Sequence, residues 1–137
     1  MAFFDSLSFL SRFSKRKADM LGQLAAINKA LAVIEFTLDG KIIKANKNFL
    51  DLMGYTLEEI KGQHHRIFVA EEERNAPAYA QFWQKLGRGE YDQRLYRRIT
   101  KSGHEVWIQA TYNPIIDALG RPFKIVKYAR DVTQQQL

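Results

Sequence analysis

The sequence predicts an α+β domain in which two strands come first, several short helices follow, and three strands close the chain. Around residues 32–45 and 90–132, apolar and polar residues alternate as they do in half-buried antiparallel strands. Between these regions, apolar residues recur at helical spacing in short segments bounded by glycine or proline. The chain has 137 residues, 46% of them hydrophobic, which suffices for one domain with a buried core.

The first two strands should form a hairpin, and two short helices should follow it. The segment AVIEFTLDGKIIKAN contains Asp39-Gly40, a dipeptide favoured in tight hairpin turns. NKNFLDLMGY is predicted to be a helix closed by Gly54. Thr56 and Glu59 have the spacing of a capping box, so TLEEI should begin the next helix. The stretch VAEEERNAP is predicted to be a loop.

A longer helix and three strands are predicted for the remainder. In PAYAQFWQKLGRG, Pro77 suits the first helical turn, and Gly87 and Gly89 suit its end. The strand-like runs YDQRLYRRIT and EVWIQATYNPI are joined by KSGH, and RPFKIVKYARDVT follows the turn DALG. This order of elements predicts an antiparallel sheet with short helices over one face.

The N-terminal region is predicted to contain two segments. Residues 1–17 form an amphipathic and basic leader whose apolar side chains would make one stripe on a helix, namely Phe3, Phe4, Leu7, Leu10 and Phe13. Such a stripe indicates peripheral membrane contact through residues 3–13, packing on a partner helix, or a loosely ordered leader. Residues 18–31 are predicted to be a flanking helix. Its coiled-coil spacing at Leu24, Ile27 and Leu31 favours a homodimer.

Composition excludes several function classes. There is no cysteine, so disulfides, thiolate nucleophiles and cysteine-ligated zinc are excluded, and a cytoplasmic location is compatible with that absence. The net charge of +6 raises nucleic acid as a partner. The basic residues are scattered, however, and those of RLYRRITK should fall on both faces of a strand, so we expect no nucleic-acid binding. No P-loop, dinucleotide fingerprint, HExxH motif or Ser-His-Asp set is present, so we expect no enzyme.

Five motifs, in order, resemble those of a PAS sensor domain, over residues 32–133. They are DGKIIKANKNFLDLMGY, LEEIKGQ, FWQKLGRGEY, RRITKSGHEVWIQATYNPI and ARDVT. The chain is most similar to the N-terminal PAS modules of bacterial chemoreceptors for aerotaxis and energy taxis. The resemblance implies a five-stranded antiparallel sheet in the order 2-1-5-4-3. It also implies that Asp131 and Thr133 pass a signal through a linker, beginning at residues 134–137, to a downstream signalling domain.

The resemblance also gives a role to the pair His64-His65. GQHHRIF corresponds to the segment in which light-sensing flavin PAS domains carry a photoactive cysteine, with His65 at the cysteine position and Arg66 at a flavin-phosphate arginine. Without cysteine, a cysteinyl-flavin photocycle is excluded. Flavin-binding aerotaxis domains have a histidine that matches His65 and share Asn46 and Trp83, so the resemblance implies FAD. Those domains carry an Arg-His-Pro run where this chain has AEEER.

In the implied PAS register, the strands turn aromatic, aliphatic, cationic and small side chains toward the helices, namely Tyr96, Arg98, Ile108, Ala110, Tyr112, Ile125, Lys127 and Ala129. Two alanines near the centre would leave room for a ligand, and aromatic, amide and cationic groups would hold a flavin. The candidate cofactor-binding residues are Asn46, His65, Arg66, Trp83, Arg98, Ala110, Tyr112, Lys127 and Ala129.

Two alternatives to a flavin stay open. Haem b would need an axial donor, and His65 is the candidate because neighbours on a helix diverge by about 100° and only one can point inward. No other metal site is predicted. Aromatic side chains could instead fill the interior, which would make the domain a cofactor-free dimerisation and signal-relay module. The preferred hypothesis is a cytoplasmic, chemotaxis-type sensory input domain that senses redox state or oxygen through a flavin.

Overall fold

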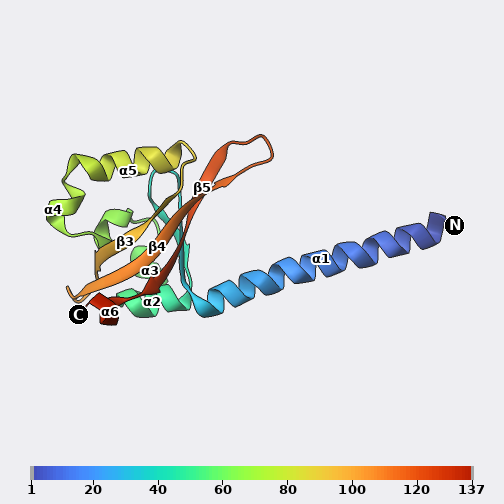
Figure 1. Cartoon of the computed structure of the whole chain (residues 1–137), viewed down its shortest axis with the longest axis horizontal. Coiled ribbons are helices and arrows are strands. Elements are labelled where there is room, and N and C mark those ends of the chain that lie inside the picture. Colours follow the sequence, from blue (N-terminus) through green and yellow to red (C-terminus); the bar gives the residue numbers. More distant parts are fainter. Residues whose placement is uncertain (1, 137) are drawn as a thin grey trace. The chain divides into compact units, whose positions relative to one another are not determined.

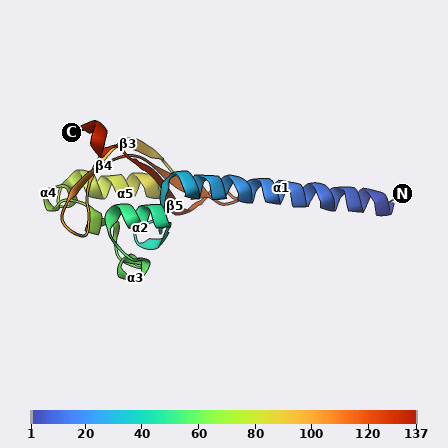
Figure 2. The ribbon, with the colours of Figure 1, turned by 90° about the horizontal axis from the view of Figure 1, so that it is seen from below.

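The computed structural model describes residues 2–136, with side chains from residue 7 onward. It divides into two compact units, Met1–Ala30 and Leu31–Leu137. The first unit consists of α1 (Ala2–Ala30), which is one uninterrupted helix in both views of the ribbon (Figures 1 and 2). It passes without a break through the boundary predicted between residues 17 and 18. The side chains of Phe3 and Phe4 lie outside the described residues.

The second unit is built on a five-stranded antiparallel sheet in the order β2-β1-β5-β4-β3, as the sequence analysis predicted. Its strands are β1 (Ala32–Phe36), β2 (Ile42–Ala45), β3 (Asp92–Ile99), β4 (Glu105–Ile116) and β5 (Pro122–Asp131). The first strand lies between its hairpin partner and the last strand, so both ends of the domain's chain meet in the middle of the sheet.

Short helices connect β2 to β3. They are α2 (Lys47–Met53), α3 (Leu57–Ile60), the 3-10 helix η1 (His65–Phe68), α4 (Glu71–Arg74) and α5 (Pro77–Gly87); α6 (Thr133–Gln136) follows the last strand. The predicted capping box of Thr56 and Glu59 is confirmed at the start of α3, and Gly54 ends α2 with φ +80°. The prediction that VAEEERNAP is a loop was wrong in part, because this stretch contains the single turn of α4.

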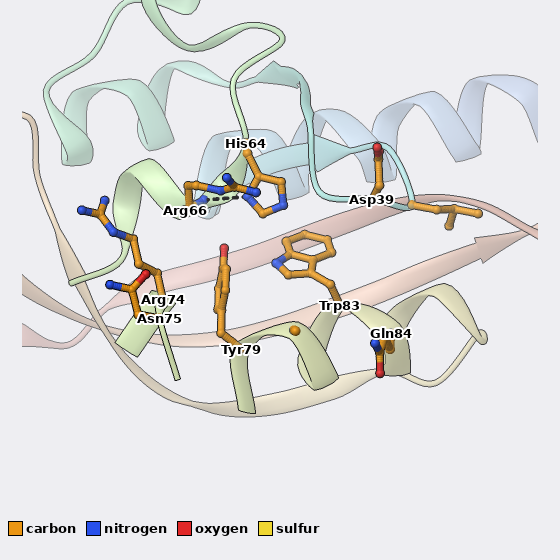
Figure 3. Close-up of a pocket in the computed structure, with 10 residues that line it drawn as sticks. Asp39, His64, Arg66, Arg74, Asn75, Tyr79, Trp83 and Gln84 are labelled. Atoms are coloured by element: carbon orange, nitrogen blue, oxygen red, sulfur yellow. Dashed lines mark hydrogen bonds between the residues drawn. The ribbon is translucent and has the colours of Figure 1, made fainter. Parts of the chain in front are cut away.

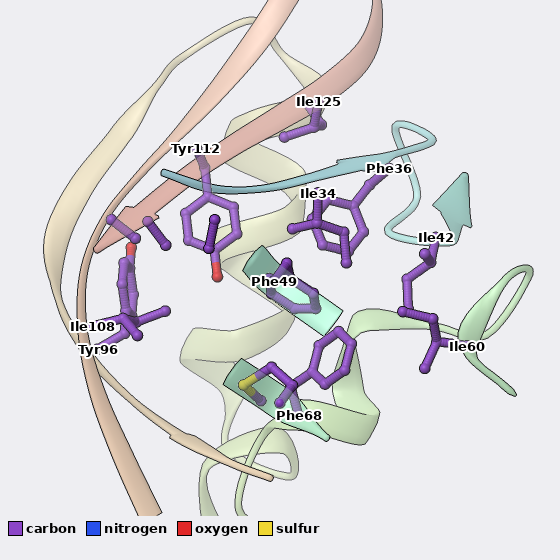
Figure 4. Packing of buried hydrophobic residues seen from close by; sticks show 14 of the residues in the cluster. Ile34, Phe36, Ile42, Phe49, Ile60, Phe68, Tyr96, Ile108, Tyr112 and Ile125 are labelled. Atoms are coloured by element: carbon purple, nitrogen blue, oxygen red, sulfur yellow. The ribbon is translucent and has the colours of Figure 1, made fainter. Parts of the chain in front are cut away.

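The core of the domain lies between these helices and one face of the sheet. Phe49 of α2 and Phe68 of η1 meet edge to face with ring centroids 5.2 Å apart, opposite Ile34 and Tyr112 of the sheet (Figure 4). All four side chains are fully or almost fully buried. Burial of such apolar area drives the helices onto the sheet, at about 25 cal/mol per Å².

The turn between β1 and β2 approaches the helical segment very closely. Gly40 has φ +90°, and a Cβ atom built there would lie 2.6 Å from Nε2 of His64 and 3.0 Å from Trp83. The backbone N–H of His65 donates to the carbonyl of Gly40 at 2.9 Å. The turn therefore needs glycine for two reasons, its backbone conformation and the space that the His64 ring occupies.

Substituting Gly40 should cost more than substituting another glycine of the same conformation. Gly40→Ala should lower the free energy of unfolding by about 1–2 kcal/mol for the left-handed backbone and by about 1–3 kcal/mol more for the overlap. Gly62→Ala is the matched control, since Gly62 has φ +83° and nothing within 4 Å of the added atom. Urea unfolding of both variants measures the difference; equal losses would contradict the close approach.

Candidate ligand-binding site

A cleft of about 630 Å³ opens between the β1–β2 turn, η1 and the helices α4 and α5 (Figure 3). It is lined by Leu38, Asp39, His64, Arg66, Arg74, Asn75, Tyr79, Ala80, Trp83 and Gln84. Its size and its mixture of aromatic and charged groups are those of a small-molecule site.

Two aromatic side chains of α5 form one wall of the cleft. Tyr79 and Trp83 are four residues apart and therefore lie on the same face of the helix. The ring of His64 meets both edge to face, at 5.7 Å from Trp83 and 6.1 Å from Tyr79. Burial raises the pKa of Tyr79 to about 12, and the indole N–H of Trp83, which is buried beside the Tyr79 hydroxyl, partly offsets that rise.

The protonation of His64 follows from its hydrogen bond. Its Nδ1 accepts the backbone N–H of Arg66 at 3.0 Å, so in the neutral ring the proton is on Nε2. Burial lowers the pKa of His64, and the nearby Arg66 guanidinium lowers it further. Because neither ring nitrogen then offers a free lone pair, His64 is a hydrogen-bonding group and not a metal ligand.

Behind this wall, His65 is fully buried and hydrogen-bonded at both ring nitrogens. Nδ1 lies 2.7 Å from the hydroxyl of Tyr79, and Nε2 lies 2.8 Å from the hydroxyl of Tyr112. Arg98 donates from Nη2 to the same Tyr112 oxygen at 3.1 Å. The buried Tyr112 hydroxyl must use its own hydrogen, and Nε2 of His65 is the acceptor beside it. His65 therefore carries its proton on Nδ1, donates to Tyr79, and leaves the Tyr79 hydrogen free for a group in the cleft.

Two cationic side chains share this interior. Arg98 and Lys127 are 2% and 1% exposed, and Arg98 Nε and Lys127 Nζ have no hydrogen-bond partner. The ammonium of Lys127 lies 4.8 Å from the centre of the Tyr112 ring, and the guanidinium of Arg98 lies 4.6 Å from that of Tyr96. Burial and the charge of Arg98 hold the pKa of Lys127 well below its usual value. Burial, Arg98 and Lys127 do the same for the pKa of His65.

The nine predicted cofactor-binding residues fall in three places. Arg66 and Trp83 line the cleft. The second place is the buried interior behind the cleft, which holds His65, Arg98, Tyr112, Lys127 and the register pair Ala110 and Ala129. The third place is the start of α2, where Asn46 accepts from the N–H groups of Phe49 and Val33 and donates to the carbonyl of Leu31. Asn46 thus caps a helix and ties it to β1.

The sequence analysis predicted only two of the ten residues that line the cleft, Arg66 and Trp83. His64 was placed outside the site, and Arg74 and Tyr79 were not singled out. The four-residue spacing of Tyr79 and Trp83 is a signal that could have found the tyrosine. Arg74 carries no such signal, because it lies on the turn of α4 that was predicted as a loop. Among the residues that the structure describes, no group of three acidic or histidine side chains could hold a metal ion.

The predicted exit motif joins the last helix to β4. The Asp131 carboxylate accepts from the N–H of Thr133 at 2.9 Å and from its hydroxyl at 2.6 Å. The Thr133 hydroxyl oxygen in turn accepts from the N–H of Trp107 at 3.0 Å. Since Thr133 is the first residue of α6, the start of this helix is tied to the same strand that carries Tyr112.

These features define the class of the protein. Residues 42–129 match the family model described as PAS fold, and the chain belongs to that family. It is 43% identical over 117 residues to the biofilm dispersion protein BdlA of Pseudomonas aeruginosa, a match that covers 85% of this chain and 28% of that protein. It is 32% identical over 79 residues to the aerotaxis receptor of Escherichia coli, covering 58% of this chain and 15% of the receptor.

Solved structures agree on the fold. The chain superposes on an RNA-binding light-oxygen-voltage receptor with a TM-score of 0.73 at 26% identity, covering 87% of this chain and 35% of that one. A PAS domain from Colwellia psychrerythraea gives 0.70 at 25% identity, covering 84% of this chain and 98% of that one. Within the described part of the chain, no helix has the length and apolar character to cross a membrane.

The buried His65 should make the stability of the domain depend on pH. Its pKa is lowered on folding, so the unfolded chain binds a proton that the folded chain does not. Stability is therefore complete above the unfolded value of about 6.5 and falls by up to about 1.4 kcal/mol per pH unit below it. Urea unfolding between about pH 6.5 and 5 measures this slope, which His65→Gln should reduce. The exposed His104→Gln is the control, and an unchanged slope in His65→Gln would contradict a neutral His65.

The unpartnered Lys127 should weaken the domain. Lys127→Met replaces a buried amine with an apolar side chain of similar length, so the free energy of unfolding of the ligand-free protein at neutral pH should rise by about 1–3 kcal/mol. Lys124→Met is the control on the same strand, because Lys124 pairs with Glu35 at 2.7 Å and its loss should bring no gain. A loss of stability in Lys127→Met would show that the ammonium has a partner.

Proposed function

We propose that this PAS domain is a sensory, non-enzymatic input module of a chemotaxis-type receptor, and that it detects redox state or oxygen through a flavin, FAD, held at the cleft. The observation that carries the proposal is the cleft itself, which is lined both by the aromatic side chains of Tyr79 and Trp83 and by the cationic side chains of Arg66 and Arg74. The relationship to an aerotaxis receptor supports the sensory role. The choice of cofactor rests on the resemblance of the segment GQHHRIF to the corresponding segment of light-sensing flavin PAS domains.

The residues of the cleft suit the parts of a flavin. Trp83 and Tyr79 offer aromatic surface to the ring system. Arg66 and Arg74 offer guanidinium groups to the phosphates. The Tyr79 hydrogen, which His65 does not use, is a donor for a ring acceptor. When bound, a flavin supplies reversible electron transfer and so a change in hydrogen bonding.

The signal would leave through groups that already touch one another. A change at the Tyr79 hydroxyl alters the bond it receives from His65, and His65 passes the change to Tyr112 on β4. Through Trp107, β4 also holds Thr133 at the start of α6. We propose that this path leads to a downstream signalling domain, in keeping with the small share of each relative's length that this chain spans.

Haem is the weaker candidate, because both nitrogens of His65 are engaged by tyrosines and an iron would have to displace Tyr112. A cofactor-free relay module is favoured by one observation, the dense packing of Phe82, Trp83 and Tyr112 around His65. For either role we propose a cytoplasmic homodimer. Its contact would be the second half of α1, where Leu24 is exposed and Ile27 half-buried, together with Leu31 just beyond the helix.

An absorption spectrum of the purified chain, before and after dithionite, tests the cofactor. The expected result is the two-banded flavin spectrum, bleached by reduction, with retention lowered tenfold to a hundredfold by Arg66→Gln or Arg74→Gln, since a charge-assisted hydrogen bond contributes about 1.5–3 kcal/mol. Arg121→Gln is the control, because Arg121 lies on the β4–β5 turn and pairs with Asp117. A single sharp haem band, or no flavin after reconstitution, would overturn the proposal.

A further inference from the structure

The helix α1 exposes large apolar side chains along its length. Phe9, Leu10 and Phe13 are 62%, 56% and 59% exposed, and Met20 and Leu24 continue the same side of the helix with 63% and 49%. An exposed apolar surface of this extent on a helix marks a site of interaction with a protein or a membrane. The question is which partner suits each half of the helix.

The two halves of α1 differ in charge. Residues 2–17 contain a single acid, Asp5, against four bases, Arg12, Lys15, Arg16 and Lys17, so their net charge is +3. Residues 18–30 contain one acid, Asp19, and one base, Lys29, so their net charge is zero. The aromatic part of the apolar stripe thus lies in the basic half, and the aliphatic part lies in the neutral half.

In the basic half, cationic and aromatic side chains adjoin. The pairs Phe9–Phe13 and Arg12–Arg16 are each four residues apart, and the four side chains together line one groove of about 350 Å³ on the helix surface. Guanidinium groups beside exposed aromatic rings are the arrangement of helices that lie in the plane of a membrane interface. There the rings enter the acyl boundary and the bases meet anionic headgroups.

We propose that residues 7–17 of α1 form a docking surface for an anionic lipid membrane, on which the helix lies flat. The charge of this half opposes its parallel pairing with a second copy, because a charge of +3 would face +3 and like charges across an interface oppose association. An anionic surface turns the same charge into attraction. The neutral half keeps its own apolar stripe for another contact, so the membrane and a partner subunit need not compete.

Co-sedimentation of the full chain with vesicles tests the proposal. The chain should bind vesicles of phosphatidylcholine mixed with phosphatidylserine, and bind phosphatidylcholine alone far less. Each basic side chain near an anionic surface raises the membrane-binding constant about fivefold. The triple variant Arg12→Gln/Lys15→Gln/Arg16→Gln should therefore bind about a hundredfold more weakly. Added salt should weaken binding of the unmodified chain in the same direction.

Matched pairs of substitutions separate the membrane from a protein partner. Phe9→Ala/Phe13→Ala should abolish sedimentation with the mixed vesicles. Met20→Ala/Leu21→Ala, which removes exposed apolar area from the neutral half outside the proposed dimer contact, should leave it unchanged. Circular dichroism controls for helix content in both pairs. No sedimentation with the mixed vesicles, or equal loss in both pairs, would overturn the proposal. So would a Phe9/Phe13 variant that only converts a dimer to a monomer.

Discussion

The burial of one neutral histidine between two tyrosines is the constraint on which the rest of this domain depends. His65 is fully enclosed, and both of its nitrogens are hydrogen-bonded. Arg98 and Lys127 lie in the same interior, and burial together with these two basic groups holds the pKa of His65 well below its usual value. The ring must therefore stay neutral, and its single proton must be on the nitrogen that Tyr112 does not use.

This constraint connects the cleft to the sheet. Tyr79 brings the hydrogen-bond chain to the cleft, and Tyr112 brings it to β4. Tyr112 and Arg98 meet across the concave face of the sheet, where Ala110 lies between their positions in the strand register. At the other end, the Gly40 carbonyl fixes the backbone of His65. The hydrogen bond at Nδ1 of His65 therefore depends on which group in the cleft accepts the hydrogen of Tyr79.

The fold could be predicted from the sequence, because its signals are local. Asp39-Gly40, the Thr56–Glu59 box and Pro77 each specify a turn or a helix end without reference to distant residues. The site could be predicted only in part. Strand alternation placed Arg98, Tyr112 and Lys127 inside, but it could not reveal that Arg98 would bond to Tyr112, a contact between strands. Strand alternation also could not reveal that the side chain of Asn46 would cap a helix. Nor could it reveal that the cleft would lie beside His64.

Nitrogen-15 NMR of the His65 ring tests the central claim most directly. The account predicts a neutral ring with its proton on Nδ1 at neutral pH, and the same tautomer below the ordinary histidine pKa of about 6.5. His65→Gln assigns the resonances of the His65 ring, and His104→Gln assigns those of the exposed His104. A proton on Nε2, or a His65 ring that becomes an imidazolium at about pH 6.5, would contradict the account.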